Sequence, residues 1–220
     1  MIRKVIRAVK NLILPRGKRF RKLPFGPASG CVMNIDFKQH AGLYLGMYEK
    51  EIEPHFLRLL KPGVRCFDVG GQGGYDALIM AKLTDEKVIS FECNADAAEE
   101  MRQTFAKNRF SIETMQVFVG GEDNESQMTL DHAATQNFMP DFIKMDIEGA
   151  EAEALKGAKT ILLRRKPSLI VEVHGEDIEK QCIEILKSHG YAPQIVNQRS
   201  RWKEHRPLNH NRWLICEGRD

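Results

Sequence analysis

The chain has 220 residues, of which 42% are hydrophobic, and a formal net charge of +3. That is enough apolar material for one sizeable core, so we expect a single catalytic domain. No run of about 18 apolar residues occurs, which excludes a membrane-spanning helix, and the basic N-terminus lacks the pattern of a signal peptide. Five widely spaced cysteines without metal-finger spacing favour reduced thiols, and we expect a cytoplasmic protein.

The charge is distributed unevenly along the chain. Nine Lys and Arg residues precede the first acid, Asp36; removing them from the 33 basic residues leaves 24 against 30 acids, a balance of about −6. This balance argues against a nucleic-acid-binding surface spread over the domain.

Between Ile2 and Ile13, apolar residues recur at helical spacing among basic ones, which predicts a short basic amphipathic helix. Residues 1–22 would contact a membrane surface or an acidic partner, or the helix would pack on the domain with its basic face in water.

Residues 1–30 are predicted to be this helix and a connector, because Lys22–Gly30 holds two prolines and two glycines, and residues 31–220 a single domain. Cys31–Phe37 alternates like a strand, and Tyr48–Leu60 is a helical run. Strands are then predicted near 64–69, 87–92, 112–119, 141–146 and 168–174, with helices near 75–83, 95–107, 149–164 and 177–188. This repeated βα pattern predicts an α/β protein with a parallel sheet and helices on both faces. Tyr191–Val196 and Trp213–Glu217 are expected to form a final hairpin-like pair.

A glycine-rich turn, Phe67–Tyr75 (FDVGGQGGY), follows the strand near 64–69. Glycines permit positive φ and let backbone N–H groups approach a ligand closely. The dinucleotide pattern G-x-G-x-x-G fails here, because Asp76 occupies the third glycine position. An acid followed by glycines two and six residues later, here Asp68, Gly70 and Gly74, instead resembles motif I of S-adenosylmethionine-dependent methyltransferases. In such a loop Asp68 is expected to bind the ammonium group of the cofactor.

Glu92 ends the next predicted strand, 22 positions after Gly70. Doubly wound folds place a carboxylate on the ribose hydroxyls at about this distance. Glu92 would otherwise be an ordinary surface acid, and the paired spacing favours the cofactor role. The residues predicted to bind S-adenosylmethionine are Asp68, Gly70, Gln72, Gly74 and Glu92.

The segment Asp141–Glu151 runs from an apolar strand into an acidic, small-residue helix start. Together with Gly46–Glu49, Phe91–Asn94 and Leu169–His174, in this order, it resembles the FkbM family of methyltransferases over roughly residues 43–190. The resemblance implies a Rossmann-like class I methyltransferase fold, whose seven-stranded, mostly parallel sheet has an antiparallel last strand and holds the cofactor at the carboxyl ends of the strands. It also implies O-methylation of a hydroxyl on a sugar or glycan, a polyketide or another metabolite.

The chain departs from the family pattern around the cofactor loop. Gln72 stands where Asn is usual, a mild change because both amides donate and accept hydrogen bonds. Gly73 replaces a larger apolar residue, so a more flexible loop is expected. Cys93 replaces the usual Pro after the ribose acid.

Methylation of an aliphatic alcohol requires an aligned oxygen and the loss of its proton. His174 is the predicted base, since a strand-end imidazole titrates near neutral pH, with a structural hydrogen bond as the alternative. Asp146 is the second candidate, as base or orienter, or else as a cap for the helix that starts near Gly149. Lys144 shares a strand face with Asp146 and is placed to neutralise it. No metal is expected, although Asp146, Glu172 and His174 would gather one if their strands were neighbours.

Two other functions fit parts of the sequence. A nucleic-acid methyltransferase would explain the basic N-terminus, but Asp146–Gly149 stands where base-methylating enzymes commonly carry Asn/Asp-Pro-Pro-Tyr. A non-catalytic module that keeps the fold is supported only by Gln72 and Gly73. The sequence therefore predicts an S-adenosylmethionine-dependent O-methyltransferase with a small-molecule or glycan acceptor, and nucleic acid is not the expected partner.

Overall fold

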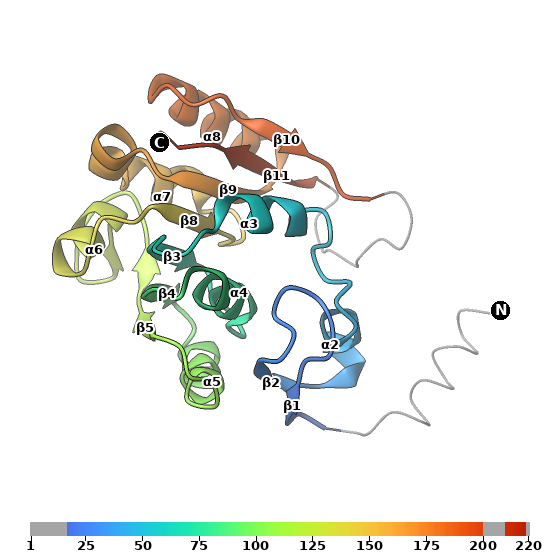
Figure 1. The fold of residues 1–220 in the computed structure, drawn as a ribbon. Coiled ribbons are helices and arrows are strands. Elements are labelled where there is room, and N and C mark those ends of the chain that lie inside the picture. The colour runs from blue at the N-terminus through green and yellow to red at the C-terminus, as the bar shows by residue number, and fades with distance from the viewer. Residues whose placement is uncertain (1–16, 200–209, 219–220) are drawn as a thin grey trace.

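The structure is a computed structural model that describes residues 17–199 and 210–218. The basic helix predicted over residues 2–13 lies outside this range. The centre of the molecule is a seven-stranded sheet flanked by helices (Figure 1). Its strands, in spatial order, are β10 (Gln194–Val196), β11 (Asn211–Cys216), β9 (Ser168–His174), β8 (Phe142–Met145), β3 (Cys66–Val69), β4 (Val88–Glu92) and β5 (Ile112–Gln116).

The strand directions confirm the predicted class I methyltransferase fold. Strands β9, β8, β3, β4 and β5 pair in parallel, whereas β11 runs antiparallel to both β9 and β10. The predicted hairpin-like pair at the end of the chain is thereby confirmed. Because parallel strands point the same way, the carboxyl ends of β3, β4 and β8 meet at one edge of the sheet.

Each face of the sheet has its own apolar core. Alternation along β3 sends Cys66 into one core and Phe67 into the other, which explains why the central strands read as continuous apolar runs. The first core is covered by α3 (Glu53–Leu59), α4 (Tyr75–Thr84) and α5 (Ala95–Phe105). The second is covered by α6 (Leu130–Gln136), α7 (Glu151–Lys156), the π-helical turn η1 (Ile161–Arg165) and α8 (Glu176–Ser188).

A two-stranded hairpin precedes the main sheet and packs beside α4 and α5 (Figure 1). β1 (Arg19–Lys22) pairs antiparallel with β2 (Val32–Ile35), and α2 (Phe37–Tyr44) follows. The turn between the strands buries Leu23 and Ala28, and Asn108 after α5 bonds the backbone N–H and C=O of Val32. The boundary predicted at residue 31 therefore falls inside this hairpin, and residues 22–30 belong to it, anchored by two buried side chains, rather than forming a separate connector.

Several predicted elements differ in extent. The helix predicted over 149–164 is divided at Gly157 into α7 and η1. The backbone of Gly157 lies against Gly120, where an added Cβ would sit 2.2 Å from the Gly120 oxygen. The strand predicted over 112–119 ends at Gln116, and β6 (Phe118–Val119) pairs with β7 (Gln127–Met128) outside the main sheet. The helical run predicted from Tyr48 is helical only from Glu53. Helices α2 and α6 were not predicted, since each is too short for a clear apolar period.

Within the described ranges, no helix combines the length and the apolar character needed to cross a membrane.

Candidate functional site

The glycine loop is held between the ends of β4 and β8. The N–H groups of Gly70 and Gly71 both donate to the Phe91 carbonyl at 2.9 Å. Gly70 has a φ of 90°, and a Cβ added there would lie 1.8 Å from the backbone oxygen of Asp146. Gly74, with a φ of 84°, begins α4. Glycine at position 70 is thus required both by the backbone conformation and by the close approach of β8.

Glu92 is fixed at the end of β4 by two main-chain donors. One carboxylate oxygen accepts from the N–H of Gln72 at 2.9 Å, and the other accepts from the N–H of Asn94 at 2.8 Å. The side chain is largely buried and lines a cavity of about 290 Å³. The other walls of this cavity are mostly apolar and include Phe91, Val117, Val119 and Ile147. The carboxylate is therefore oriented before any ligand arrives.

A second, larger cavity of about 640 Å³ lies on the other side of the glycine loop. Its walls come from the hairpin, from α2, and from the segments around residues 47 and 199, and they mix apolar and polar groups: Met33, Asn34, Gln39, His40, Leu43, Met47, Tyr48 and Arg199. Gly70, Gln72, Ala97 and Asp146 line both cavities. Asp146 is thus the acid at their junction.

Asp68 lines neither of these two cavities. Its carboxylate is only 1% exposed and accepts a 2.6 Å hydrogen bond from the Ser90 hydroxyl of the neighbouring strand. Burial raises the pKa of Asp68 to about 6, against the opposing effects of the Ser90 hydrogen bond and the charge of Lys144. The carboxylate thus supports the loop from inside the protein, and its predicted contact with an ammonium group stays a prediction.

A buried lysine lies among three acids beneath the larger cavity. Lys144 of β8 is 1% exposed, and its Nζ is 3.4 Å from Asp76 Oδ2, 3.9 Å from Glu49 Oε2 and 4.0 Å from Asp146 Oδ2. Burial opposes its charge, but the acids outweigh burial and hold the pKa of Lys144 well above its ordinary value. Burial also raises the pKa of Asp146, with Lys144 acting in the opposite direction. Lys144 therefore lies near Asp146, as its position on the same strand face predicted.

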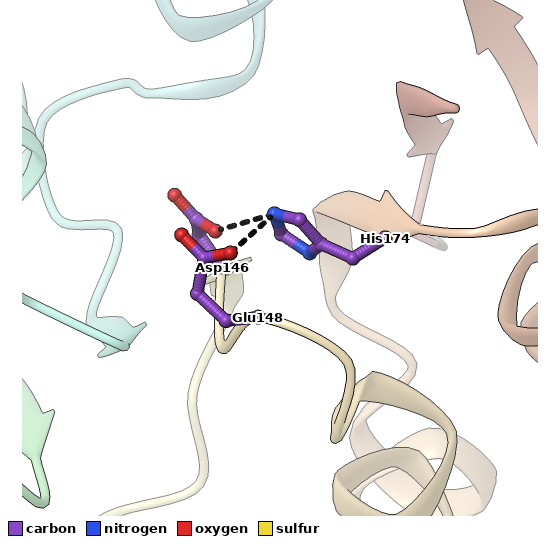
Figure 2. Close-up of side chains that lie close together, drawn as sticks. All are labelled: Asp146, Glu148 and His174. Atoms are coloured by element: carbon purple, nitrogen blue, oxygen red, sulfur yellow. Dashed lines mark ion pairs between the residues drawn. The ribbon is translucent and has the colours of Figure 1, made fainter. Parts of the chain in front are cut away.

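His174 lies at the end of β9, the parallel neighbour of β8. Its Nδ1 is 2.7 Å from Glu151 Oε1, and its Nε2 is 3.5 Å from both Asp146 Oδ1 and Glu148 Oε2 (Figure 2). Burial disfavours the charged ring, but the hydrogen bond to Glu151 and the charge of Asp146 prevail and raise the pKa of His174.

The structure brings the two predicted catalytic residues together but gives them different access. Asp146 lines both cavities, whereas His174 is 7% exposed and lines neither. This access favours Asp146 over His174 as the candidate base, the opposite order to the prediction from the sequence. Asp146 does not cap the helix near Gly149, since α7 has no side-chain cap; Glu151 Oε1 accepts from the N–H groups of Ile147 and Gly149, in the loop before the helix, at 3.3 and 3.1 Å.

Sequence reasoning missed two groups of site residues. Asp76 was noticed only as the residue that breaks a dinucleotide pattern, although its place one turn into α4 puts it beside Lys144. The walls that the hairpin and α2 contribute to the larger cavity carried no signal in the sequence, because their position depends on packing against α4 and α5.

Comparison with protein families gives a match to the methyltransferase FkbM domain over residues 51–195. A search of curated proteins finds no match to this chain. Among solved structures, the FkbM methyltransferase of Methylobacillus flagellatus KT is similar at 19% identity and a TM-score of 0.54, covering 74% of this chain and 50% of its own.

Two further structures were determined with a cofactor or its product. The tRNA (uracil-54, C5)-methyltransferase of Pyrococcus abyssi, in complex with S-adenosyl-L-homocysteine, has 14% identity and a TM-score of 0.59, covering 92% of this chain and 45% of its own. The fibrillarin of Aeropyrum pernix, with natively bound S-adenosyl-L-methionine, has 13% identity and a TM-score of 0.53, covering 72% of this chain and 67% of its own. At these identities the likenesses show the fold alone, and this chain spans half or less of the first two structures' length. The family match covers most of the chain, which therefore belongs to the FkbM methyltransferase family and is, by family and fold, an S-adenosylmethionine-dependent methyltransferase.

Proposed function

We propose that the protein O-methylates a small-molecule or glycan hydroxyl, with S-adenosylmethionine in the 290 Å³ cavity and the acceptor in the 640 Å³ cavity. The observation that carries this proposal is the position of Asp146, which lines both cavities where they meet. When bound, the cofactor supplies an electrophilic methyl group. The junction is where such a group and an acceptor oxygen would be brought together.

The smaller cavity fits the chemistry of a nucleoside. Its apolar walls suit an adenine ring, and Glu92 presents a carboxylate whose remaining lone pairs can accept from the two ribose hydroxyls. Gln72, which lines both cavities, and the turn from Gly70 to Gly74 would pass beside the amino-acid half. Asp68 has a supporting role in this proposal, since it holds the start of the loop through Ser90.

Asp146 would act on the acceptor. Its side chain lines both cavities, so its carboxylate would take a hydrogen bond or a proton from an acceptor hydroxyl. His174 stands 3.5 Å behind it, away from both cavities, and would position the carboxylate and stabilise its charge. The mixed lining of the larger cavity suits an acceptor with both apolar and polar parts.

Asp146→Asn tests this assignment, because the amide keeps the shape of the side chain and removes its basicity. We expect S-adenosylmethionine binding, measured by calorimetry, to stay within about threefold and methyl transfer to a panel of hydroxyl acceptors to fall about 100-fold or more. Asp96→Asn, at an exposed acid in the first turn of α5, is the matched control and should leave both unchanged. Undiminished transfer by Asp146→Asn would remove Asp146 from the mechanism.

A further inference from the structure

The ends of β8 and β9 hold three side chains around one small volume. Asp146 Oδ1 and Glu148 Oε2 each lie 3.5 Å from His174 Nε2, and the three ligand atoms are all within 4.8 Å of one another. In Figure 2 both carboxylates point at the same nitrogen of the imidazole ring. Parallel pairing of β8 with β9 produces this convergence, whereas the group considered from the sequence joined Asp146 and His174 with Glu172 in place of Glu148.

The orientation of the histidine ring is set from the other side. Nδ1 lies 2.7 Å from Glu151 Oε1, and Glu151 is fully buried. The same oxygen accepts from two main-chain N–H groups, so Glu151 is held as an acceptor for the Nδ1 proton. A neutral ring held in this way directs the lone pair of Nε2 toward Asp146 and Glu148. Histidines that bind metals are almost always oriented by a carboxylate or carbonyl on the other nitrogen.

The nitrogen that faces the cluster, His174 Nε2, lies near carboxylates but forms no hydrogen bond with any described residue. His174 is 7% exposed, and its Nε2 forms no hydrogen bond within the part of the chain that the structure describes. Asp146 Oδ1 is likewise buried and accepts no hydrogen bond from the described residues. Lys144 does not fill this role, because it approaches the other oxygen of Asp146, at 4.0 Å. A further carboxylate oxygen, Glu172 Oε1, is 3.7 Å from Nε2 and adds negative charge.

The spacing fits a coordinated ion better than a shared proton. A hydrogen bond from Nε2 to a carboxylate would be about 2.7–3.2 Å long, shorter than the 3.5 Å found to each acid. Two ligand atoms that are 3.5 Å apart and each about 2.1 Å from a common ion subtend about 110° there, near the tetrahedral angle. One imidazole and two carboxylates form a donor set that suits a first-row divalent metal.

We propose that Asp146, Glu148 and His174 bind one divalent transition-metal ion, with at least one coordination position open toward the acceptor. The inference rests on the proposed function for the part that the ion plays, because Asp146 is also the acid at the cavity junction. With the ion bound, Asp146 would act as its ligand in place of acting as the base; the ion would hold the acceptor oxygen and make its hydroxyl more acidic. The proton then leaves to water, the oxygen takes the methyl group, and the sulfur keeps the electron pair of the broken C–S bond.

Metal binding by the full chain tests the proposal without any acceptor. Bound metal is first removed from the protein with a chelator. Binding of Co²⁺ is then followed by visible absorption, and binding of Zn²⁺ by calorimetry. The titrations use a Cys93→Ser background, because this exposed thiol lines the smaller cavity and is a soft ligand of its own. We expect one equivalent of ion and a cobalt absorption band in the visible range.

Two variants locate the ion. Glu148→Gln changes a side chain that is 57% exposed, so it should fold normally, and metal affinity should fall about tenfold or more. His174→Asn should abolish the cobalt band, with circular dichroism as the check on folding. His132→Asn is the matched control, since His132 pairs with Asp123 on the surface, and should leave the affinity unchanged.

Absence of stoichiometric metal binding in the Cys93→Ser background would overturn the metal site. So would a metal affinity in Glu148→Gln and His174→Asn equal to that of the Cys93→Ser protein. Calorimetry with S-adenosylmethionine on the same metal-free sample separates the two proposals. Cofactor binding without metal binding removes only the metal, whereas metal binding without cofactor binding removes the proposed function.

Discussion

The end of β4 and the neighbouring ends of β8 and β9, which meet at the glycine loop, differ in how their polar groups are satisfied. At the end of β4, both oxygens of Glu92 accept main-chain hydrogen bonds, so the charge is held in one orientation. At the ends of β8 and β9, Asp146 and Lys144 carry buried polar atoms that have no hydrogen-bond partner among the described residues. Buried polar groups are normally satisfied, and the exceptions concentrate where a ligand or a reaction completes them. In the proposed function, the β4 end is therefore preorganised for the cofactor, and the β8–β9 end is completed by the acceptor.

The first prediction concerns the close contact between the glycine loop and the end of β8. Gly70→Ala would place a Cβ 1.8 Å from the Asp146 oxygen, so β3 and β8 must move apart. We expect a loss of about 3 kcal/mol or more in the free energy of unfolding, measured by urea denaturation. Gly63→Ala is the control, because Gly63 has the same φ of 90° and nothing within 4 Å of an added Cβ.

That control should cost only about 1–2 kcal/mol, the strain of a side chain in the left-handed region. If Gly70→Ala and Gly63→Ala lower the free energy of unfolding equally, the close approach of β8 to the loop does not restrict the side chain at position 70.

The second test concerns the preorganised end. Glu92→Ala removes the oriented carboxylate, and the dissociation constant for S-adenosylmethionine should rise about 10- to 100-fold by calorimetry. Glu99→Ala on α5, whose acid bonds only within its own helix, should bind the cofactor normally. Unchanged affinity in Glu92→Ala would show that the β4 end does not hold the ribose.

The last prediction concerns Asp68, which supports the glycine loop, and the pH dependence of stability. The folded-state pKa of Asp68, about 6, lies above the ordinary 3.8, so the folded protein binds this proton more readily than the unfolded chain. Its contribution to stability is therefore fully present below about pH 4 and is lost as the pH rises through about 6. Across this window the free energy of unfolding of Asp68→Asn should fall less than that of the unaltered chain, by up to about 3 kcal/mol. Parallel stability curves for the two proteins would contradict a proton on Asp68.

The sequence showed the position of Glu92 at the end of β4 but not the burial of Asp68 in β3, for a physical reason. The spacing from Gly70 to Glu92 is a property of one βα unit and is visible along the chain. The access of Asp68 depends instead on its partner across the sheet: register pairs it with Ser90, whose hydroxyl keeps the carboxylate inside. Local spacing cannot show on which side of a strand end a cavity will open.

The same limit explains the reversal of His174 and Asp146. Both were identified as strand-end groups, and parallel pairing of β8 with β9 brought them to 3.5 Å. Which of them reaches the cavities depends on the walls that the hairpin and α2 provide. Residues 22–30 looked like a connector because of their prolines and glycines, although Leu23 is buried and anchors the turn. The flexibility expected of the loop at Gly73 stays a prediction.

The most direct test of the account is a crystal structure of the full chain with S-adenosylhomocysteine. The account predicts the adenosine in the 290 Å³ cavity, ribose hydroxyls at hydrogen-bond distance, about 2.7 Å, from Glu92, and the sulfur facing Asp146 at the cavity junction. Adenosine in the larger cavity, or a sulfur directed away from Asp146, would contradict it.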